Sequence, residues 1–537
     1  MFFVVLAFIF FALTGCESYN NVQQKPSVEG SIVDNAGWYG DETNSTIDIN
    51  IYIEKPNHLL CVPYDDLNAA ARPCTLADID NDIDAEDSYK PVLGVMMSAN
   101  GYSGSDTMPN ATLKTRGAYS RTAEQKSYSL KLNSKTELYL RQRKFQFIKS
   151  QSDKSRVKNK LAYDLFRTIP NITSLKTQFV HLFIDDIDYG LFTHVEAIRK
   201  EYLINRGWNK DDNLYNAANC FFEPRDELAV DGNGKPLNVE DFNTVLEIKN
   251  GENHSKVVEM IDAVNSSEDI DRVIDKYFNR DNYLTWLAIN LVLNNKDTTY
   301  HNFYLYNPKY SSTFYFLPWD YDGAWTTTEY IGKNEYGISV WWESPLHKKF
   351  LSKKKNRDDL YAMAELLRKE YITDAAIRER LDAYEPTVRP FMSKIPDSEH
   401  NSDESWQKAT NYLVTGIEEN IRLYKSVIGD PMPFRQYADY NKSNGILSLS
   451  WDKSIDFEGD AIVYDLNLSK DSNFTNIVLE VTDINTTKYQ QNIHLDDGIY
   501  YLKVISREEN NSSHYQIAID QVYENKTIYG VLRFEVK

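Results

Sequence analysis

A helix that is apolar on nearly every face constrains this 537-residue chain more than any other segment. Residues 281–293 carry apolar side chains all round the predicted helix: Tyr283, Leu284, Trp286, Leu287, Ile289, Leu291, Val292 and Leu293. A helix without a polar face has to be buried on all sides. The segment therefore predicts a large domain packed around it, and the chain is long enough for two or three domains.

Strand and helix patterns alternate around that central helix. Alternating or β-branched runs predict strands at 126–132, 178–184, 190–195 and 314–317, whereas i, i+4 apolar spacing predicts helices over 157–169 and within 358–428. Residues 28–112 mix short strand-like runs, at 47–53 and 92–97, with polar turns, which indicates a β-rich N-terminal region. We therefore predict the α+β class.

An acidic run at residues 78–84 is superficially similar to a calcium-binding loop. It lacks the glycine at the sixth position and the glutamate at the twelfth position of such loops. We interpret it as a solvated acidic loop.

The composition changes after Pro431-Met432-Pro433, and residues 437–537 show short strands at regular intervals. Strands are predicted at 446–451, 464–468 and 498–504. An early strand that ends in Trp451 and a later Gly-x-Tyr-Tyr-x-x-Val strand resemble a fibronectin type III β-sandwich. Such a module serves as a spacer or a binding surface, so we assign it no chemistry.

The N-terminus carries an export signal. Residues 2–13 are an unbroken apolar run that would span about 18 Å as a helix, too short for a bilayer. We therefore predict that residues 1–15 are a signal peptide, although no Lys or Arg precedes the apolar run. Leu13-Thr14-Gly15-Cys16 resembles the bacterial lipobox, which implies a lipid on Cys16, a tether over 16–27 and a membrane-anchored, periplasmic or cell-surface protein.

An oxidising compartment permits a disulfide between Cys61 and Cys74 and leaves Cys220 as a free, buried thiol. The formal net charge of −20 would repel a phosphate backbone, so we exclude nucleic acid as a partner. The nine histidines are scattered and show no zinc spacing.

Two polar clusters carry the candidate chemistry. Residues 294–302 follow the buried helix and contain Asp297 and Asn302, and Asp320 and Asp322 follow a predicted strand. Asp297 and Asn302 have the Asp-x-x-x-x-Asn spacing of a protein-kinase catalytic loop, and Asp320 stands where the metal-binding Asp would follow. Carboxylate and amide oxygens of this kind hold Mg²⁺ across nucleotide phosphates.

Together with upstream blocks, these clusters resemble the CotH family of atypical kinases over residues 110 to 390. The matching blocks are 114–121 with 126–128, 158–165, 190–196, 295–297 with Asn302, and 319–322. The resemblance implies an atypical protein-kinase-like domain over 113–430, followed by the fibronectin type III-like sandwich over 437–537.

The resemblance also implies roles for single residues. Asp297 would be catalytic, and Asn302, Asp320 and Asp322 would bind Mg²⁺. The nucleotide-binding residues implied are these: Arg116, Arg121 and Lys126 at the ATP phosphates, with Lys131 as the competing lysine, Asp164 paired with that lysine, and Glu196 at the hinge. No Gly-x-Gly-x-x-Gly loop is present, so side chains would make the phosphate contacts.

Two functions follow as expectations. The first is transfer of the ATP γ-phosphate to Ser or Thr of exported or surface proteins. The second is a non-catalytic surface pseudokinase or adhesin that binds proteins or glycans.

Overall fold

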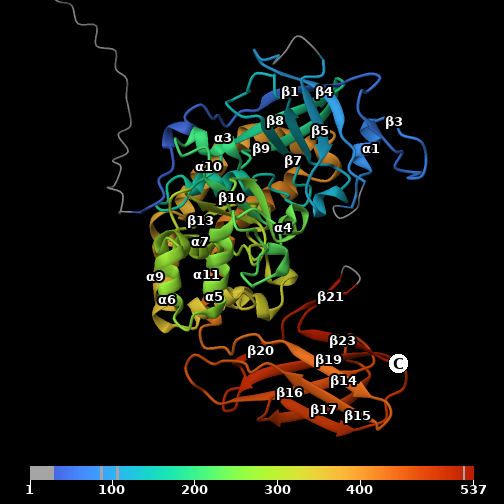
Figure 1. The fold of residues 1–537 in the computed structure, drawn as a ribbon, viewed down its shortest axis with the longest axis vertical. Helices are drawn as coiled ribbons and strands as arrows, with labels where there is room; N and C mark the ends of the chain where they lie inside the picture. Colours follow the sequence, from blue (N-terminus) through green and yellow to red (C-terminus); the bar gives the residue numbers. More distant parts are fainter. Residues whose placement is uncertain (1–29, 85–88, 104–107, 524–525) are drawn as a thin grey trace, which may run out of the picture.

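The computed structural model describes residues 30–537 except 85–88, 104–107 and 524–525. The predicted signal peptide, Cys16 and the tether over 16–27 lie outside the described residues. Figure 1 shows a β-barrel, a helical part and a C-terminal β domain that follow one another along the long axis. Among the described helices, none combines the length and the apolarity needed to cross a membrane.

Seven strands form a closed barrel in the order β1-β4-β5-β6-β7-β9-β8. They are β1 (Ile47–Ile53), β4 (Leu93–Ala99), β5 (Ala111–Thr115), β6 (Tyr128–Leu132), β7 (Lys144–Ile148), β8 (Thr177–Ile184) and β9 (Ile187–Val195). The parallel pairing of β1 with β8 closes the barrel. Strands from both the 28–112 region and the 113–430 region thus share one core, which includes Val95, Leu113 and Phe147.

The acidic run at 78–84 is not a solvated loop, and that prediction was wrong. Residues Leu76–Asp80 form the short helix α1, in which Asp78 is fully buried and accepts bonds of 2.8 and 3.0 Å from Arg72. Asp82 is also buried and pairs with Arg121. Each carboxylate is buried because a cation from outside the run reaches it. Nearby, Cys61 and Cys74 form a disulfide, and Cys220 is free and buried.

The helical part packs around α7 (Arg280–Val292), whose residues 282–292 are all buried, as the sequence predicted. The other helices are α2 (Lys158–Phe166), α3 (Lys200–Asn205), α4 (Val239–Val245), α5 (Ser255–Ser266), α6 (Ile270–Tyr277), α8 (Pro345–Leu351), α9 (Lys354–Glu370), α10 (Asp374–Val388) and α11 (Asp403–Ser426). A small sheet has the order β11-β10-β12-β13, with β10 (Asn213–Ala217), β11 (Leu246–Asn250), β12 (Phe303–Asn307) and β13 (Tyr315–Pro318). The α+β class is confirmed.

The C-terminal domain is all β and has its own hydrophobic core, which includes Trp451, Tyr464 and Leu502. One sheet has the order β14-β15-β18, and the other has the order β17-β16-β19-β20 with β23 on β19. The strands are β14 (Gln436–Asn441), β15 (Ile446–Trp451), β16 (Ile462–Ser469), β17 (Ile477–Ile484), β18 (Lys488–Asn492), β19 (Gly498–Glu508), β20 (Tyr515–Ile517) and β23 (Val531–Val536), with a separate pair β21 (Gln521–Tyr523) and β22 (Lys526–Ile528).

Candidate active site

The antiparallel pair β12–β13 brings the two polar clusters together. Phe303 at the start of β12 is the register partner of Pro318 at the end of β13. Asn302 immediately precedes β12, and Asp320 follows β13 by two residues. A separation of 18 positions in sequence therefore becomes proximity at one end of the hairpin.

Asp297, Asn302, Asp320 and Asp322 line one cavity of about 440 Å³ together with Arg116. Its other lining residues come from the segment between β5 and β6, from the end of β7 and the residues that follow it in sequence, and from the loop after β13. The cavity thus lies between the barrel and the helical part, where both contribute side chains.

Two donors hold the Asp297 carboxylate in place. Asn302 Nδ2 donates to Oδ2 at 2.6 Å, and His301 Nε2 lies 2.8 Å from Oδ1. Because the amide nitrogen of Asn302 faces Asp297, its carbonyl oxygen stays available as a cation ligand. Asp297 itself is 45% exposed, so its carboxylate can also meet an incoming group.

The carboxylates of the cavity repel one another. Burial, opposed by the guanidinium of Arg116, raises the pKa of the Asp320 carboxyl above its ordinary value. The charge of Asp320, followed by burial and the charge of Asp297, raises the pKa of Asp322 well above its ordinary value. Such mutual repulsion in a cleft is typical of a functional site, and a bound cation would relieve it.

Helix α2 fixes the turn that carries Asp320. The Tyr163 hydroxyl accepts a bond of 3.0 Å from the Asp320 backbone N–H, and Asn159 Oδ1 accepts one of 2.9 Å from the Tyr321 N–H. Lys158 Nζ lies 3.4 Å from the Asp322 carbonyl oxygen. The block 158–165 thus supports the site through backbone contacts and does not itself line the cavity.

Residues 113–424 match the family described as CotH kinase protein, which is more than half of the chain. The chain belongs to the CotH kinase family. The inner spore coat protein H of Bacillus subtilis (strain 168) is 22% identical over 299 residues, which cover 52% of this chain and 77% of that protein. Strands β1 and β4 precede the matched range, although they complete the barrel of the family domain.

Of the residues expected to bind the nucleotide in this member of the CotH kinase family, Arg116 lines the cavity, and the other five, the competing Lys131 included, do not. Arg121 is paired with Asp82 and also donates a bond of 2.7 Å to the Gly117 carbonyl oxygen. Lys126 donates to the Arg121 carbonyl oxygen at 2.5 Å. Both side chains therefore stabilise the loop between β5 and β6. Lys131 is exposed on the outer face of β6 and is the register partner of Lys144.

Asp164 and Glu196 lie in separate buried ion clusters. Asp164 pairs with Lys160 at 3.1 Å and with Arg167 at 2.9 Å, and it does not contact Lys126. Glu196 accepts two bonds of 3.0 Å from Arg206. Asp164 therefore does not make the expected pair with Lys126. Glu196 is bound to Arg206, and these contacts do not include the expected hinge role.

The sequence assigned no role to two residues at or beside the cavity, His301 and Asn295. His301 lies in the predicted cluster, and its position four residues after Asp297 was an available signal. Asn295 is buried with both side-chain polar atoms lacking a hydrogen-bond partner, and its Oδ1 lies close to Gly323. Asn295 begins the 295–297 block of the family resemblance, but the sequence assigned it no role.

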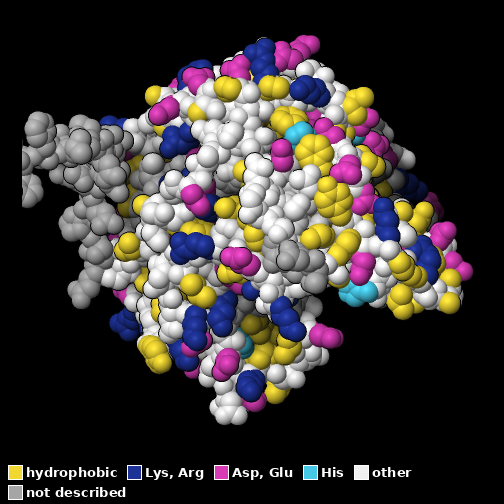
Figure 2. All heavy atoms as spheres, turned by 90° about the horizontal axis from the view of Figure 1, so that it is seen from above, with side chains coloured by type: hydrophobic (Ala, Val, Ile, Leu, Met, Phe, Trp, Pro, Cys, Tyr) yellow, Lys and Arg dark blue, Asp and Glu magenta, His cyan; other side chains and the backbone are white. Residues whose placement is uncertain are grey.

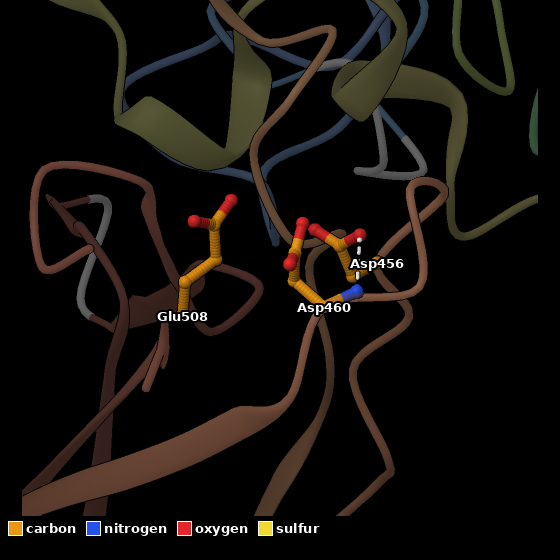
Figure 3. Close-up of side chains that lie close together, drawn as sticks. All are labelled: Asp456, Asp460 and Glu508. Atoms are coloured by element: carbon orange, nitrogen blue, oxygen red, sulfur yellow. Dashed lines mark hydrogen bonds between the residues drawn. The ribbon is translucent and has the colours of Figure 1, made fainter. Parts of the chain in front are cut away.

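A second acidic cluster lies in the C-terminal domain and consists of Asp456, Asp460 and Glu508 (Figure 3). Asp456 Oδ1 accepts bonds from the backbone N–H groups of Glu458 and Asp460, and Glu508 pairs with His514 at 2.8 Å. Asp456 therefore stabilises the turn over residues 456–460, and Glu508 has a partner of its own, so these contacts account for the cluster.

Proposed function

We propose that this chain is a secreted, lipid-anchored protein kinase that transfers the γ-phosphate of ATP to Ser or Thr hydroxyls of exported or surface proteins. One observation carries the proposal: Asp297, Asn302, Asp320 and Asp322 line one cavity. Membership of the CotH kinase family supports the reaction class. The spore-coat name of the Bacillus relative supports a location at a surface.

The cavity residues fit a magnesium–nucleotide complex. The carbonyl oxygen of Asn302 and the carboxylates of Asp320 and Asp322 are oxygen ligands of the kind that Mg²⁺ prefers. Burial is the main cause of the raised pKa of Asp320, and the charge of Asp320 is the main cause of the raised pKa of Asp322; the charge of Arg116 opposes both shifts without cancelling them. When bound, ATP would supply the transferable phosphoryl group and Mg²⁺ the positive charge that this cluster lacks.

The residues of the chain position the acceptor and the phosphates. Asp297 accepts a hydrogen bond from the substrate hydroxyl and takes up its proton as the oxygen attacks. His301 and Asn302 prevent rotation of that carboxylate, since each holds one of its oxygens. Arg116 offers charge-assisted hydrogen bonds to phosphate oxygens inside the cavity.

We also propose a kinase-like arrangement for residues 113–430. Three features support it: β5, β6 and β7 contribute strand ends or adjoining loops to the cavity, α2 holds the Asp320 turn, and the β12–β13 pair carries the catalytic residues. For residues 437–537 we propose a fibronectin type III-like spacer. The packing of a three-strand sheet and a five-strand sheet supports it, as does the Tyr500 hydroxyl, which donates to the Asp496 carbonyl oxygen at 3.1 Å like a tyrosine corner.

The test of the kinase is transfer of radiolabelled phosphate from ATP to the chain itself and to a mixture of exported proteins. Asp297→Asn and Asp320→Ala should reduce transfer at least 100-fold, because orientation and charge balance are lost. Asp358→Asn is the matched control, since Asp358 is exposed on α9 and remote in sequence from the site. Equal transfer by wild type and Asp297→Asn would refute the assignment.

The lipid anchor has its own test. Cys16→Ser should leave the chain in the aqueous phase of a detergent partition, whereas the wild type should follow the detergent. Mass spectrometry of the mature N-terminus should find the acyl groups on Cys16. An unmodified N-terminus would exclude the anchor.

A second candidate function is a non-catalytic surface adhesin. A groove of about 930 Å³ on the C-terminal domain favours it, because Phe474, Tyr501, Tyr523 and Tyr529 line the groove with aromatic rings that suit proteins or glycans. Thermal unfolding separates the two functions. Millimolar Mg-ATP should raise the midpoint of a kinase by mass action and leave that of an adhesin unchanged.

A further inference from the structure

A short turn connects the C-terminal domain with the catalytic loop, residues 294–302. This bridging turn consists of Gly332 and the 3-10 helix Lys333–Glu335, and strand β20 of the C-terminal domain contacts that helix. The C-terminal domain lies outside the range matched by the CotH kinase family, which ends at residue 424. The bridging turn therefore joins a domain without assigned chemistry to the loop that carries Asp297.

The bridging turn holds the catalytic loop by an ion pair. Lys296 Nζ lies 3.0 and 2.8 Å from the two carboxylate oxygens of Glu335, and Lys296 immediately precedes Asp297. Glu335 Oε2 also accepts a bond of 3.3 Å from the Gly332 N–H, which fixes the carboxylate on the turn. A movement of the turn would therefore move Lys296 and the residue beside it.

An ion pair alone would be weak evidence on this surface. Figure 2 shows acidic and basic side chains interspersed over one face, and exposed pairs contribute little. The Lys296–Glu335 pair is partly buried, and Lys296 Nζ also lies 3.4 Å from the Tyr330 carbonyl oxygen. In addition, Thr299 Oγ1 lies 3.5 Å from the Val340 carbonyl oxygen. The catalytic loop is thus tethered at two points to the segment that includes the bridging turn.

The C-terminal domain packs against the bridging turn. Gly332 lies so close to that domain that a Cβ at this position would stand 3.0 Å from Tyr529 Cδ1 and 3.3 Å from Asp520 Oδ2. Lys333 Nζ lies 4.2 Å from the centre of the Tyr515 ring, a distance at which an aromatic face attracts a cation. The contact therefore combines close packing with an electrostatic attraction.

Two further contacts fix the orientation of the C-terminal domain. The fully buried Gln516 donates from Nε2 to Ser339 Oγ at 3.4 Å. Phe457 packs against the core of the helical part, where the Arg357 guanidinium lies 3.6 Å from its ring centre and the Trp342 ring packs edge-on at 5.6 Å. Because separate groups of contacts join the two parts, each group opposes rotation of the domain about the other.

Building on the proposed kinase function, we propose that the C-terminal domain positions the catalytic loop, with Glu335 as the positioning residue that transmits the contact to Lys296 and Asp297. The loop needs such support, because Asn294 and Asn302 have positive φ and a strained backbone persists only where its surroundings enforce it. The domain thus has a task in addition to that of a spacer: it keeps the Asp297 carboxylate where the acceptor hydroxyl must meet it. The bridging turn is not part of the described lining of the cavity, so the contact should affect the rate of transfer and not the affinity for Mg-ATP.

Kinetics of the full chain test the positioning role. Glu335→Gln should lower the rate of transfer at saturating ATP by about fivefold or more and leave the Mg-ATP affinity, measured by calorimetry, within about twofold of wild type. Glu329→Gln is the matched control, because Glu329 is exposed, lies six residues earlier and makes no ion pair with a residue that the structure describes. Lys296→Met should cause the same loss and the double variant no further loss, since both changes break one contact. Additive losses would contradict a shared contact.

Hydrogen exchange of the full chain without nucleotide tests the domain contact independently of the reaction. Tyr529→Ala removes the ring that lies against Gly332 and should speed exchange in peptides over residues 294–302 by about threefold or more. Tyr529 is 39% exposed, so its truncation should leave the fold intact, and a melting curve checks this. Tyr437→Ala is the control, since Tyr437 is also exposed and its hydroxyl lies near Asp452 of the same domain.

The outcomes separate this proposal from the kinase assignment. Unchanged exchange over 294–302 in folded Tyr529→Ala, or transfer by Glu335→Gln at the rate of Glu329→Gln, overturns the positioning proposal and leaves the kinase in place. A wild-type chain that transfers no phosphate refutes the kinase, whereas faster exchange in Tyr529→Ala would still show that the domain holds the loop.

Discussion

Replacing Glu196 distinguishes a nucleotide ligand from a structural ion pair. The Arg206 side chain is fully buried and the Glu196 side chain is 1% exposed. Glu196 accepts bonds from both terminal nitrogens of Arg206 at 3.0 Å, from Trp38 Nε1 at 3.1 Å and from the Lys176 N–H at 3.1 Å. Glu196→Gln removes the negative charge and leaves a buried guanidinium with fewer acceptors.

The magnitude follows from that environment. Removing one partner of a buried ion pair costs about 3–5 kcal/mol, because the other charge remains buried. Asp34 Oδ1 still lies 3.0 Å from Arg206 Nε, and glutamine keeps one acceptor oxygen. Both effects place the expected loss of unfolding free energy at the lower end, about 3 kcal/mol.

Denaturant unfolding followed by tryptophan fluorescence measures the loss, and calorimetry with Mg-ATP measures nucleotide affinity. We expect a lower unfolding midpoint and an unchanged affinity for the folded variant. Glu385→Gln serves as the control, since Glu385 and its partner Arg389 are both 41% exposed and surface pairs contribute little. An unchanged midpoint combined with weaker nucleotide binding would show that Glu196 is a ligand after all.

Three further perturbations test the site and the barrel. Asp322→Asn should raise the free energy of unfolding in Mg²⁺-free buffer above about pH 4. The pKa of Asp322 is higher in the folded than in the unfolded protein, so the wild-type protein loses stability as pH rises and this carboxyl ionises. The uncharged asparagine avoids that loss. Melting curves across pH check this, and a variant less stable at pH 8 contradicts it. Gly323→Ala puts a Cβ 3.2 Å from Asp297 Cβ and should lower transfer severalfold with little change in melting midpoint. Cys61→Ser opens a 13-residue loop and should cost about 3 kcal/mol of stability without loss of transfer; reduced and oxidised wild type give the comparison.

The sequence located the carboxylates of the site because they follow strong local signals. Asp297 and Asn302 come after a helix that could only be buried, and Asp320 follows a short strand that Pro318 ends. Whether a segment is a helix or a strand, and where it ends, can be predicted from nearby residues. These local predictions were enough to identify Asp297, Asn302 and Asp320, which line one cavity.

The contacts of the other residues expected to bind the nucleotide could not be predicted in the same way, because their partners are distant in sequence. Asp164 is held by a hydrogen bond from Tyr384, 220 positions away. Arg121 is engaged by Asp82, and the same contact buries the acidic run that was expected to be solvated. The parallel pairing of β1 with β8 is likewise a long-range feature that no local period encodes.

Backbone strain gives a further reason why the two loops of the site belong together. Asn294, Asn302, Asp320 and Trp325 all have positive φ, between 46° and 58°. Such conformations cost about 1–3 kcal/mol each in residues other than glycine and persist only where the surroundings enforce them. Here Asn294 Nδ2 bonds to the Thr326 carbonyl oxygen at 2.6 Å, and the Trp325 N–H bonds to the Leu293 carbonyl oxygen at 2.6 Å, so each loop holds the other in its strained form. Glycine at 302 or 320 would relieve the strain but would remove a ligand oxygen. The chain keeps the costly residues at the positions where the proposed chemistry needs their side chains.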